Sequence, residues 1–110
     1  GYAKLELKHR EKIRKLILWY LVDSGAKPVK VVLVLDSKVG ITDFDREMLA
    51  VLRAEGHPYL IVANKIDKLN QKETFAALKR IRDESREQEV FPYSAKTKKG
   101  VETVLEKLLS

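Results

Sequence analysis

"VKVVLVLD", residues 29–36, is the stretch that decides the fold of this chain. Its apolar, mostly β-branched residues do not alternate with polar ones, as they would in a strand with one solvent face. A continuous run of this kind is typical of a strand in a parallel sheet, where helices cover both faces. We therefore expect a buried parallel strand that ends at the carboxylate of Asp36, and we expect that carboxylate to cap the following loop.

The segment before this strand has the apolar spacing of a helix. Residues 6–22 place apolar side chains at helical intervals, namely Ile13, Leu16, Ile17, Tyr20 and Leu21. Gly25 and Pro28 then stop the pattern. The spacing predicts an amphipathic helix with one buried face, in which Trp19 and Tyr20 fill the core or a groove.

Capping residues mark the helices that follow. Thr42 and Asp45 match a capping box and predict a second helix, which ends before the loop residue His57. Asn70 and Glu73 predict a third helix in the same way. A last helix is expected over residues 100–109, with Val101, Val104, Leu105 and Leu108 on its buried side.

Two further strands complete the pattern. Residues 59–63 and 89–93 are short apolar runs between the helices, which gives the order α-β-α-β-α-β-α. Short connections between such elements require right-handed crossovers, so we expect a three-layer α/β fold around a parallel three-stranded sheet. Residues 1–110 form one domain in this prediction. Ligands of open parallel sheets bind beyond the carboxyl ends of the strands.

Composition excludes several classes of protein. The 110 residues contain no cysteine, so disulfides and thiolate metal sites are excluded. The two histidines lie far apart in the sequence and do not form a metal-ligand pair. The chain has no apolar run long enough to span a membrane and no secretory leader, so we expect a cytoplasmic protein without a membrane partner.

The net charge of +6 would attract phosphate-rich partners such as RNA. Lys and Arg cluster over residues 4–15 and again over residues 96–99. Solvated helix faces and a charged loop explain such clusters equally well. No aromatic residues are interleaved with them, as a stacking platform for nucleic acid bases would require.

The second predicted strand ends in three polar side chains, Asn64, Lys65 and Asp67. On its own this set is also compatible with a simple turn capped by an Asn or Asp. A guanine base, however, needs an acceptor for its N1–H and 2-amino groups, and the carboxylate of Asp67 provides one that adenine cannot use. Asn64 can bridge two loops and approach N7 of the base, and the stem of Lys65 can lie over the ring.

A matching set follows the third predicted strand. The backbone N–H of Ala95 can point at O6 of guanine, Ser94 can orient the Asp67 carboxylate, and Lys96 can cover the second face of the base. Because both sets follow strands of one parallel sheet, they meet at the same edge. Together they predict a guanine-binding site, which either set alone would indicate only weakly.

These two motifs resemble the guanine-recognition motifs of P-loop GTPases. The stretches "GYAK", "VVLVLDSKVGITDFDREML" and "VFPYSAKTKKG" also resemble the C-terminal part of the EngB (YihA/YsxC) family over essentially the full chain. That family often carries Thr at the position of Asn64, whereas Asn is the general choice of GTPases. The resemblance implies binding of GTP and GDP with Mg²⁺, and a role in assembly of the large ribosomal subunit, with that subunit or ribosomal RNA as partner.

A phosphate-binding loop of the form G-x-x-x-x-G-K-[ST] does not occur in the sequence. The resemblance implies a six-stranded domain of which the last three strands are here, so we expect a partial G domain without the P-loop, the switch regions or the Mg²⁺ ligands. Such a chain retains the base-recognition half and is predicted to be inactive in GTP hydrolysis by itself. The start at Gly1, without Met, fits a piece of a longer protein.

Two alternatives and one consequence remain open. The chain can instead be a basic module that contacts RNA or the ribosome through its first helix, or an excised or engineered half-domain without nucleotide-dependent activity. In the resembling family the strand at residues 29–36 lies beside the P-loop strand. Without that neighbour it has an open edge, so we expect self-association there.

Overall fold

The computed structural model describes residues 2–110, with side chains described from residue 4 onward. Its elements run, in chain order, through α1 (Tyr2–Leu18), a π-helical turn η1 (Trp19–Asp23), β1 (Val31–Asp36), α2 (Asp43–Ala54), β2 (Tyr59–Asn64), a 3₁₀ turn η2 (Ile66–Lys68), α3 (Gln71–Ser85), β3 (Val90–Pro92) and α4 (Val101–Leu109). The predicted alternation of helices and strands is confirmed, with boundaries that differ from the expected ones by a few residues.

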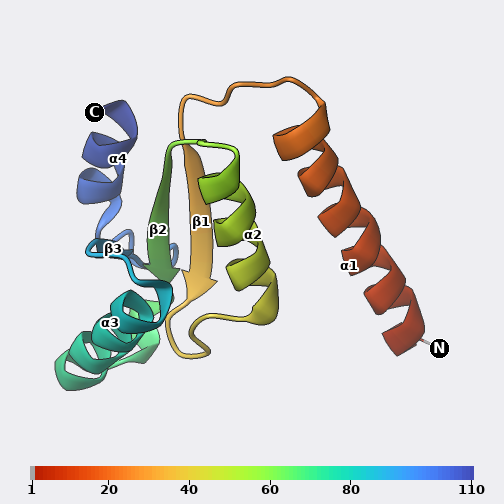
Figure 1. Cartoon of the computed structure of the whole chain (residues 1–110). Coiled ribbons are helices and arrows are strands. Elements are labelled where there is room, and N and C mark those ends of the chain that lie inside the picture. Colours follow the sequence, from red (N-terminus) through yellow and green to blue (C-terminus); the bar gives the residue numbers. More distant parts are fainter. Residues whose placement is uncertain (1) are drawn as a thin grey trace.

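The three strands form one parallel sheet in the order β1-β2-β3 (Figure 1). The β1 strand pairs with β2 from Val31 opposite Tyr59 to Asp36 opposite Asn64. The β3 strand pairs with the other edge of β2, over three residues. All three strands therefore end on the same side of the sheet, as the right-handed crossover rule requires.

The predicted helix caps are confirmed. Thr42 accepts a hydrogen bond from the backbone N–H of Asp45, and the Asp45 side chain accepts one from the backbone N–H of Thr42. Asn70 and Glu73 form the same reciprocal pair at the start of α3. These bonds satisfy N–H groups that an α-helix leaves without partners in its first turn.

The main core lies on one face of the sheet, between the strands, α2 and α3. It includes Leu33 and Leu35 of β1, which point to this face because alternate residues of a strand share a side. Ile81 of α3 is completely buried there. The remaining buried members are Leu21, Met48, Leu49, Leu52, Ile61, Ala63 and Val90.

The opposite face of the sheet is only partly covered, which corrects the prediction of a strand buried on both faces. Val34 is 55% exposed, and Val32 is half-buried beneath α4. The α4 helix itself has no fully buried residue, and its Leu105 is 50% exposed, whereas burial was expected. A continuous apolar run predicts that both faces can be covered, but the covering element is missing on this side of β1 within residues 2–110.

The first helix also departs from its prediction. Only Leu21 is fully buried and Ile17 half-buried, while Ile13 and Leu16 are 49% and 63% exposed. The expectation that Trp19 and Tyr20 fill the core is wrong, since they are 54% and 44% exposed. In Figure 1, α1 leans away from α2 toward its N-terminus, so there is little for its apolar face to pack against.

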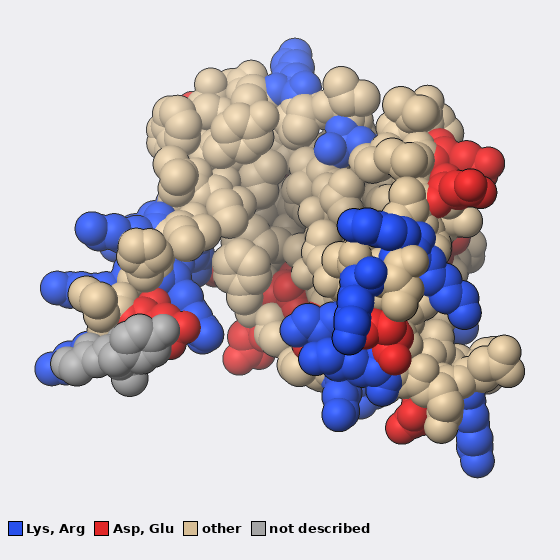
Figure 2. Space-filling model, turned by 180° about the vertical axis from the view of Figure 1, so that it is seen from behind, with Lys and Arg blue, Asp and Glu red and all other residues tan. Residues whose placement is uncertain are grey.

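Two polar contacts fix the C-terminal part of α1 and the η1 turn. Arg14 donates to both carboxylate oxygens of Glu47 on α2, at 2.6 and 2.7 Å. A ring nitrogen of His57, which lies in a loop as predicted, is 2.7 Å from the carbonyl oxygen of Leu21. The rest of α1 projects as an arm that carries many Lys and Arg side chains (Figure 2).

No helix within the described residues is long and apolar enough to cross a lipid bilayer.

Candidate functional site

The backbone turns sharply where β2 ends. Lys65 has φ of 69° and ψ of 29°, the left-handed conformation that a residue with a side chain rarely adopts. The 3₁₀ turn η2 follows at once, and its buried Ile66 donates a backbone hydrogen bond of 3.2 Å to the carbonyl of Tyr93. This turn directs Asn64 and Asp67 toward the loop that follows β3, and unusual backbone conformations of this kind are concentrated at functional sites.

Two side-chain hydrogen bonds join the two predicted motifs. The hydroxyl of Ser94 donates to Oδ1 of Asp67 at 2.7 Å, and the backbone N–H of Ala95 donates to Oδ1 of Asn64 at 3.1 Å. Ser94 is completely buried, and its Oγ also accepts from the backbone N–H of Thr97 at 3.0 Å. The expected contacts of Asn64 and Ser94 with the opposite loop are therefore present.

The position of the second loop is fixed by its backbone. The carbonyl of Ser94 accepts from the N–H of Lys98 at 2.8 Å, and the N–H of Ser94 donates to the carbonyl of Lys99 at 3.0 Å. Gly100 has φ of 88°, and a Cβ placed there would lie 2.2 Å from the carbonyl oxygen of Pro92. Only glycine fits this position, and its close approach holds the loop against the end of β3.

Lys65 forms a contact that the sequence did not predict. Its Nζ lies 3.0 Å from Oδ2 of Asp36, so the side chain crosses from the end of β2 to the end of β1. The other oxygen of Asp36 accepts from the backbone N–H groups of Lys38 and Val39, at 2.9 and 3.2 Å. These two bonds confirm the predicted role of Asp36 in capping its loop.

The electrostatic environment of Asp36 favours its charged form. Burial acts to raise the pKa of this carboxyl group, but the hydrogen bonds from Lys65 and from the backbone of Lys38 and Val39 act more strongly together and lower it. Asp36 is therefore ionised at neutral pH and holds the ammonium group of Lys65 at the strand ends.

Two of the predicted site residues are placed differently from the rest. Lys96 is exposed and makes no hydrogen bond or ion pair within the described part of the chain. The N–H of Ala95, expected to point at a base oxygen, is already bonded to Asn64. A base oxygen can reach this N–H only if Asn64 shares the bond or releases it.

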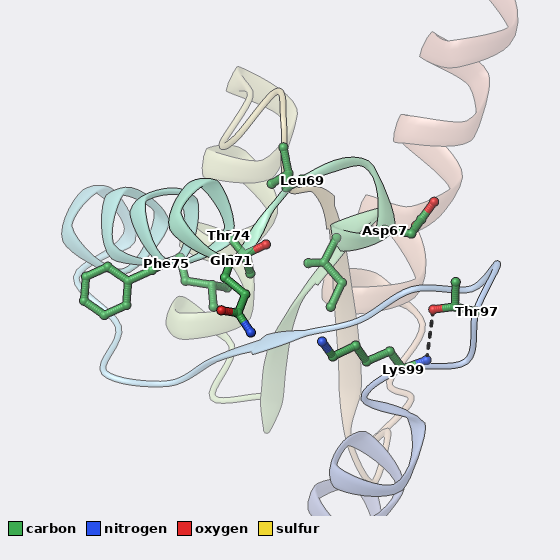
Figure 3. Close-up of a pocket in the computed structure, with 9 residues that line it drawn as sticks. Asp67, Leu69, Gln71, Thr74, Phe75, Thr97 and Lys99 are labelled. Atoms are coloured by element: carbon green, nitrogen blue, oxygen red, sulfur yellow. Dashed lines mark hydrogen bonds between the residues drawn. The ribbon is translucent and has the colours of Figure 1, made fainter.

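The largest hollow lies beside these loops, between α3 and residues 97–99 (Figure 3). Its volume is about 660 Å³, and its lining residues are Ile66, Asp67, Leu69, Gln71, Thr74, Phe75, Leu78, Thr97 and Lys99. Asp67 is the one predicted site residue among them, and in Figure 3 its carboxylate points away from Gln71, Phe75 and Lys99. The sequence gave no sign of this groove except the apolar spacing of α3, in which Phe75 is 68% exposed.

Comparison with known proteins gives one family throughout. Residues 22–110 match the family model of the elongation factor Tu GTP-binding domain. The chain is 42% identical to the probable GTP-binding protein EngB of Mycoplasmopsis agalactiae over 83 residues, which are 73% of this chain and 41% of that protein. It is 35% identical to its counterpart in Mycoplasmopsis synoviae over 113 residues, covering 100% of this chain and 59% of that protein.

A solved structure agrees with these sequence matches. A crystal structure of a probable GTP-binding protein engB superimposes with a TM-score of 0.68 and 23% identity, over 90% of this chain and 64% of that one. This likeness shows the fold, while the sequence matches show the type. The chain spans between 41% and 59% of the length of the two relatives named above. It belongs to the family of elongation factor Tu GTP-binding domains, and within that family it is of the EngB type.

Proposed function

We propose that residues 64–67 and 94–96 form the guanine-contacting surface of an EngB-type GTPase domain. The observation that carries this proposal is the pair of hydrogen bonds that joins the two loops, from Ser94 to Asp67 and from Ala95 to Asn64. Both loops follow neighbouring strands of a parallel sheet, at the end where such sheets bind ligands.

The geometry at Asp67 suits a guanine base. Ser94 holds Oδ1, while Oδ2 has no protein partner within residues 2–110 and is available to accept hydrogen bonds. A carboxylate with both oxygens in one plane can accept from N1–H and from the 2-amino group at once. Adenine has no donor at either position, so the same surface would reject it.

The remaining residues surround the position of the base. Lys65 is held at the strand ends by Asp36, which keeps its methylene stem extended where it can lie over one face of the ring. Lys96 is exposed beside the second loop, and we assign it to the other face. Asn64 gives up its bond to Ala95 when the base binds, which frees that backbone N–H for O6.

Activities of a full-length protein are part of the proposal, since the chain spans only 41% to 59% of two relatives. By resemblance to the EngB family, we propose that such a protein binds GTP and GDP, hydrolyses GTP and takes part in assembly of the large ribosomal subunit. Mg²⁺ does not fit this chain's own residues, because the described part holds no group of three or more His, Asp or Glu side chains that could bind a metal.

The base contact is tested by NMR titration of the chain with guanosine and with adenosine. Guanosine should shift the backbone amide signals of residues 64–67 and 94–96, and adenosine should not. Asp83→Asn is a matched control, because Asp83 is exposed on α3 and paired only with Lys79. Equal responses to both nucleosides, or shifts confined to the groove near Phe75, would contradict the proposal.

A second candidate function is contact with RNA through α1. Residues 4–15 carry six Lys or Arg side chains and two Glu, and residues 4–13 are all exposed. Figure 2 shows these basic side chains along the projecting arm. Phosphate contacts predict that affinity for single-stranded RNA falls steeply with salt and that neutralising Lys8, Lys12 and Lys15 together reduces the salt slope by about 2 to 3. Guanosine binding should respond to neither change.

A further inference from the structure

We propose that a second copy of this chain binds the open edge of β1 as an antiparallel strand, with the two-fold axis at Leu33. This interface is separate from the proposed base-contacting loops, so either can hold without the other. It commits the expected self-association of residues 29–36 to one partner, one direction and one register.

The hydrogen bonds of β1 show which residues face the open edge. Val31 donates its backbone N–H to the carbonyl of Pro58 at 2.8 Å, and Ser37 donates to the carbonyl of Asn64 at 2.9 Å. Odd-numbered residues of β1 therefore direct their backbone groups toward β2. Val32 and Val34 direct theirs to the other edge, where no further strand lies within residues 2–110.

The edge lacks the features that normally prevent strand addition. Residues 31–35 contain no proline, glycine or charged side chain, and the pairing with β2 is regular along them. The α1 helix and the η1 turn do not cover the face of Val32 and Val34, because Leu21 packs with Leu33 in the core on the opposite face. The edge is therefore available for pairing with another strand.

The uncovered face beside this edge is apolar. An open depression of about 270 Å³ lies between β1 and α4, and its lining residues are Val32, Val34, Val62, Tyr93, Val101, Val104, Leu105 and Leu108. Val34 and Leu105 are half or more exposed there. In antiparallel pairing, residues opposite each other share a face, so two such depressions would become neighbours on one face of a six-stranded sheet.

Side-chain complementarity selects the register. With the axis at Leu33, Val32 lies opposite Val34 of the second copy, and Lys30 lies opposite Asp36 of the second copy. Both pairings occur twice because of the symmetry. Backbone N–H and C=O groups of Val32 and Val34 face one another in this register, which gives the hydrogen-bonded pairs of an antiparallel ladder.

The two neighbouring registers are less favourable. An axis at Val34 would place Val32 opposite Asp36 and Lys30 opposite Lys38. An axis at Val32 would place Lys30 opposite Val34. Apolar side chains would then face charges, and the first alternative would also bring two ammonium groups together. The charge pattern at the two ends of β1 therefore fits the axis at Leu33 alone among these three.

Disulfide trapping tests the register directly, since the chain contains no cysteine. We expect an equimolar mixture of the Val32→Cys and Val34→Cys proteins to form a mixed disulfide dimer under mild oxidation. Each variant alone should give little dimer. Efficient trapping of Val34→Cys with itself would place the axis at Val34 and overturn the proposed register, as would equal trapping in all three samples.

Association itself is measured by sedimentation equilibrium over a range of concentrations. Val34→Pro removes an N–H that points to the open edge and leaves the bonds to β2 intact, so the fold should survive while the dimer dissociation constant rises at least tenfold. Val34→Thr keeps the N–H and the side-chain shape, and it should retain the dimer. Circular dichroism checks that both variants fold. A monomer at all concentrations, or open-ended oligomers without the mixed disulfide, would overturn the proposal.

Discussion

The hydroxyl of Ser94 and Oδ1 of Asp67 are 2.7 Å apart and connect the loops that follow β2 and β3. Ser94 is completely buried, so this bond forms away from solvent. Its Oγ also accepts from Thr97, which makes Ser94 the point that joins both the Asp67 turn and its own loop. The orientation of the Asp67 carboxylate therefore depends on a residue that no ligand needs to touch.

Replacement of Ser94 by Ala should weaken both the fold and the proposed base contact. The change leaves the N–H of Thr97 without its partner and frees the Asp67 carboxylate to rotate, at a cost of about 1 to 3 kcal/mol in the free energy of unfolding. Urea denaturation measures that cost, and NMR titration with guanosine measures the binding. Ser94→Thr keeps the hydroxyl and should retain more of the binding than Ser94→Ala. If both variants bind guanosine equally well, Ser94 has no part in orienting Asp67.

The base preference should rest on Asp67 itself. In Asp67→Asn the side-chain amide opposes the 2-amino group of guanine but can donate to the 2-oxo group of xanthine, so preference should move from guanosine to xanthosine. Competition between the two nucleosides, followed by NMR on wild type and variant, measures the change. Selectivity that does not change in the variant would remove Asp67 from the site. Asp83→Asn should leave the preference for guanosine as it is in the wild type.

Local signals in the sequence predicted the elements and their order well. The capping pairs Thr42–Asp45 and Asn70–Glu73 depend on residues three apart, so their geometry can be inferred without knowledge of the fold. The contacts of Asn64 and Ser94 could be predicted because parallel strands end on one side of a sheet.

Burial was predicted less well, because periodicity shows which residues share a face but not whether anything covers it. Leu16 and Val34 belong to apolar faces, yet they are 63% and 55% exposed. The ion pair of Lys65 with Asp36 and the groove beside Phe75 join residues 29 or more positions apart or surfaces of different elements. Neither feature has a local pattern that could reveal it.

Gly100 and Gly25 offer a matched pair for testing loop geometry. Both have positive φ, 88° and 76°, but a Cβ at Gly100 would meet the Pro92 carbonyl at 2.2 Å, whereas one at Gly25 would meet nothing within 4 Å. Gly25→Ala should cost about 1 kcal/mol from backbone strain alone. Gly100→Ala should cost about 2 to 3 kcal/mol more, because the loop must move away from β3. Equal costs in urea denaturation would show that the loop relaxes freely.

The ion pair at the strand ends should make stability depend on pH at acidic values. The pKa of Asp36 is lowered in the folded chain, since the bonds from Lys65, Lys38 and Val39 together outweigh the effect of burial. A carboxyl group with a lowered folded pKa contributes stability that is fully present above its unfolded pKa, about 3.9, and is lost as pH falls through the folded value.

Comparison of the wild type with Asp36→Asn isolates this contribution. The difference in their free energies of unfolding should be constant from pH 7 to about pH 5 and should shrink below pH 4. Urea denaturation at several pH values gives the difference. A difference that stays constant down to pH 2 would mean that the Asp36 carboxylate stabilises the folded chain no more than a neutral amide does.

The 110-residue chain by itself should not distinguish GTP from GDP and should not hydrolyse GTP. Recognition of phosphates in P-loop proteins depends on backbone N–H groups and a Lys within G-x-x-x-x-G-K-[ST], and no such stretch occurs in this sequence. The proposed base contacts alone predict weak binding, with dissociation constants on the order of millimolar. Lys96, Lys98 and Lys99 can attract phosphates through charge but cannot count them, so GDP and GTP should bind alike and both should weaken with salt. Isothermal titration with guanosine, GDP and GTP at two salt concentrations measures this. A strong preference for the triphosphate at high salt, or hydrolysis that Asp67→Asn abolishes, would show that these residues read more of the nucleotide than its base.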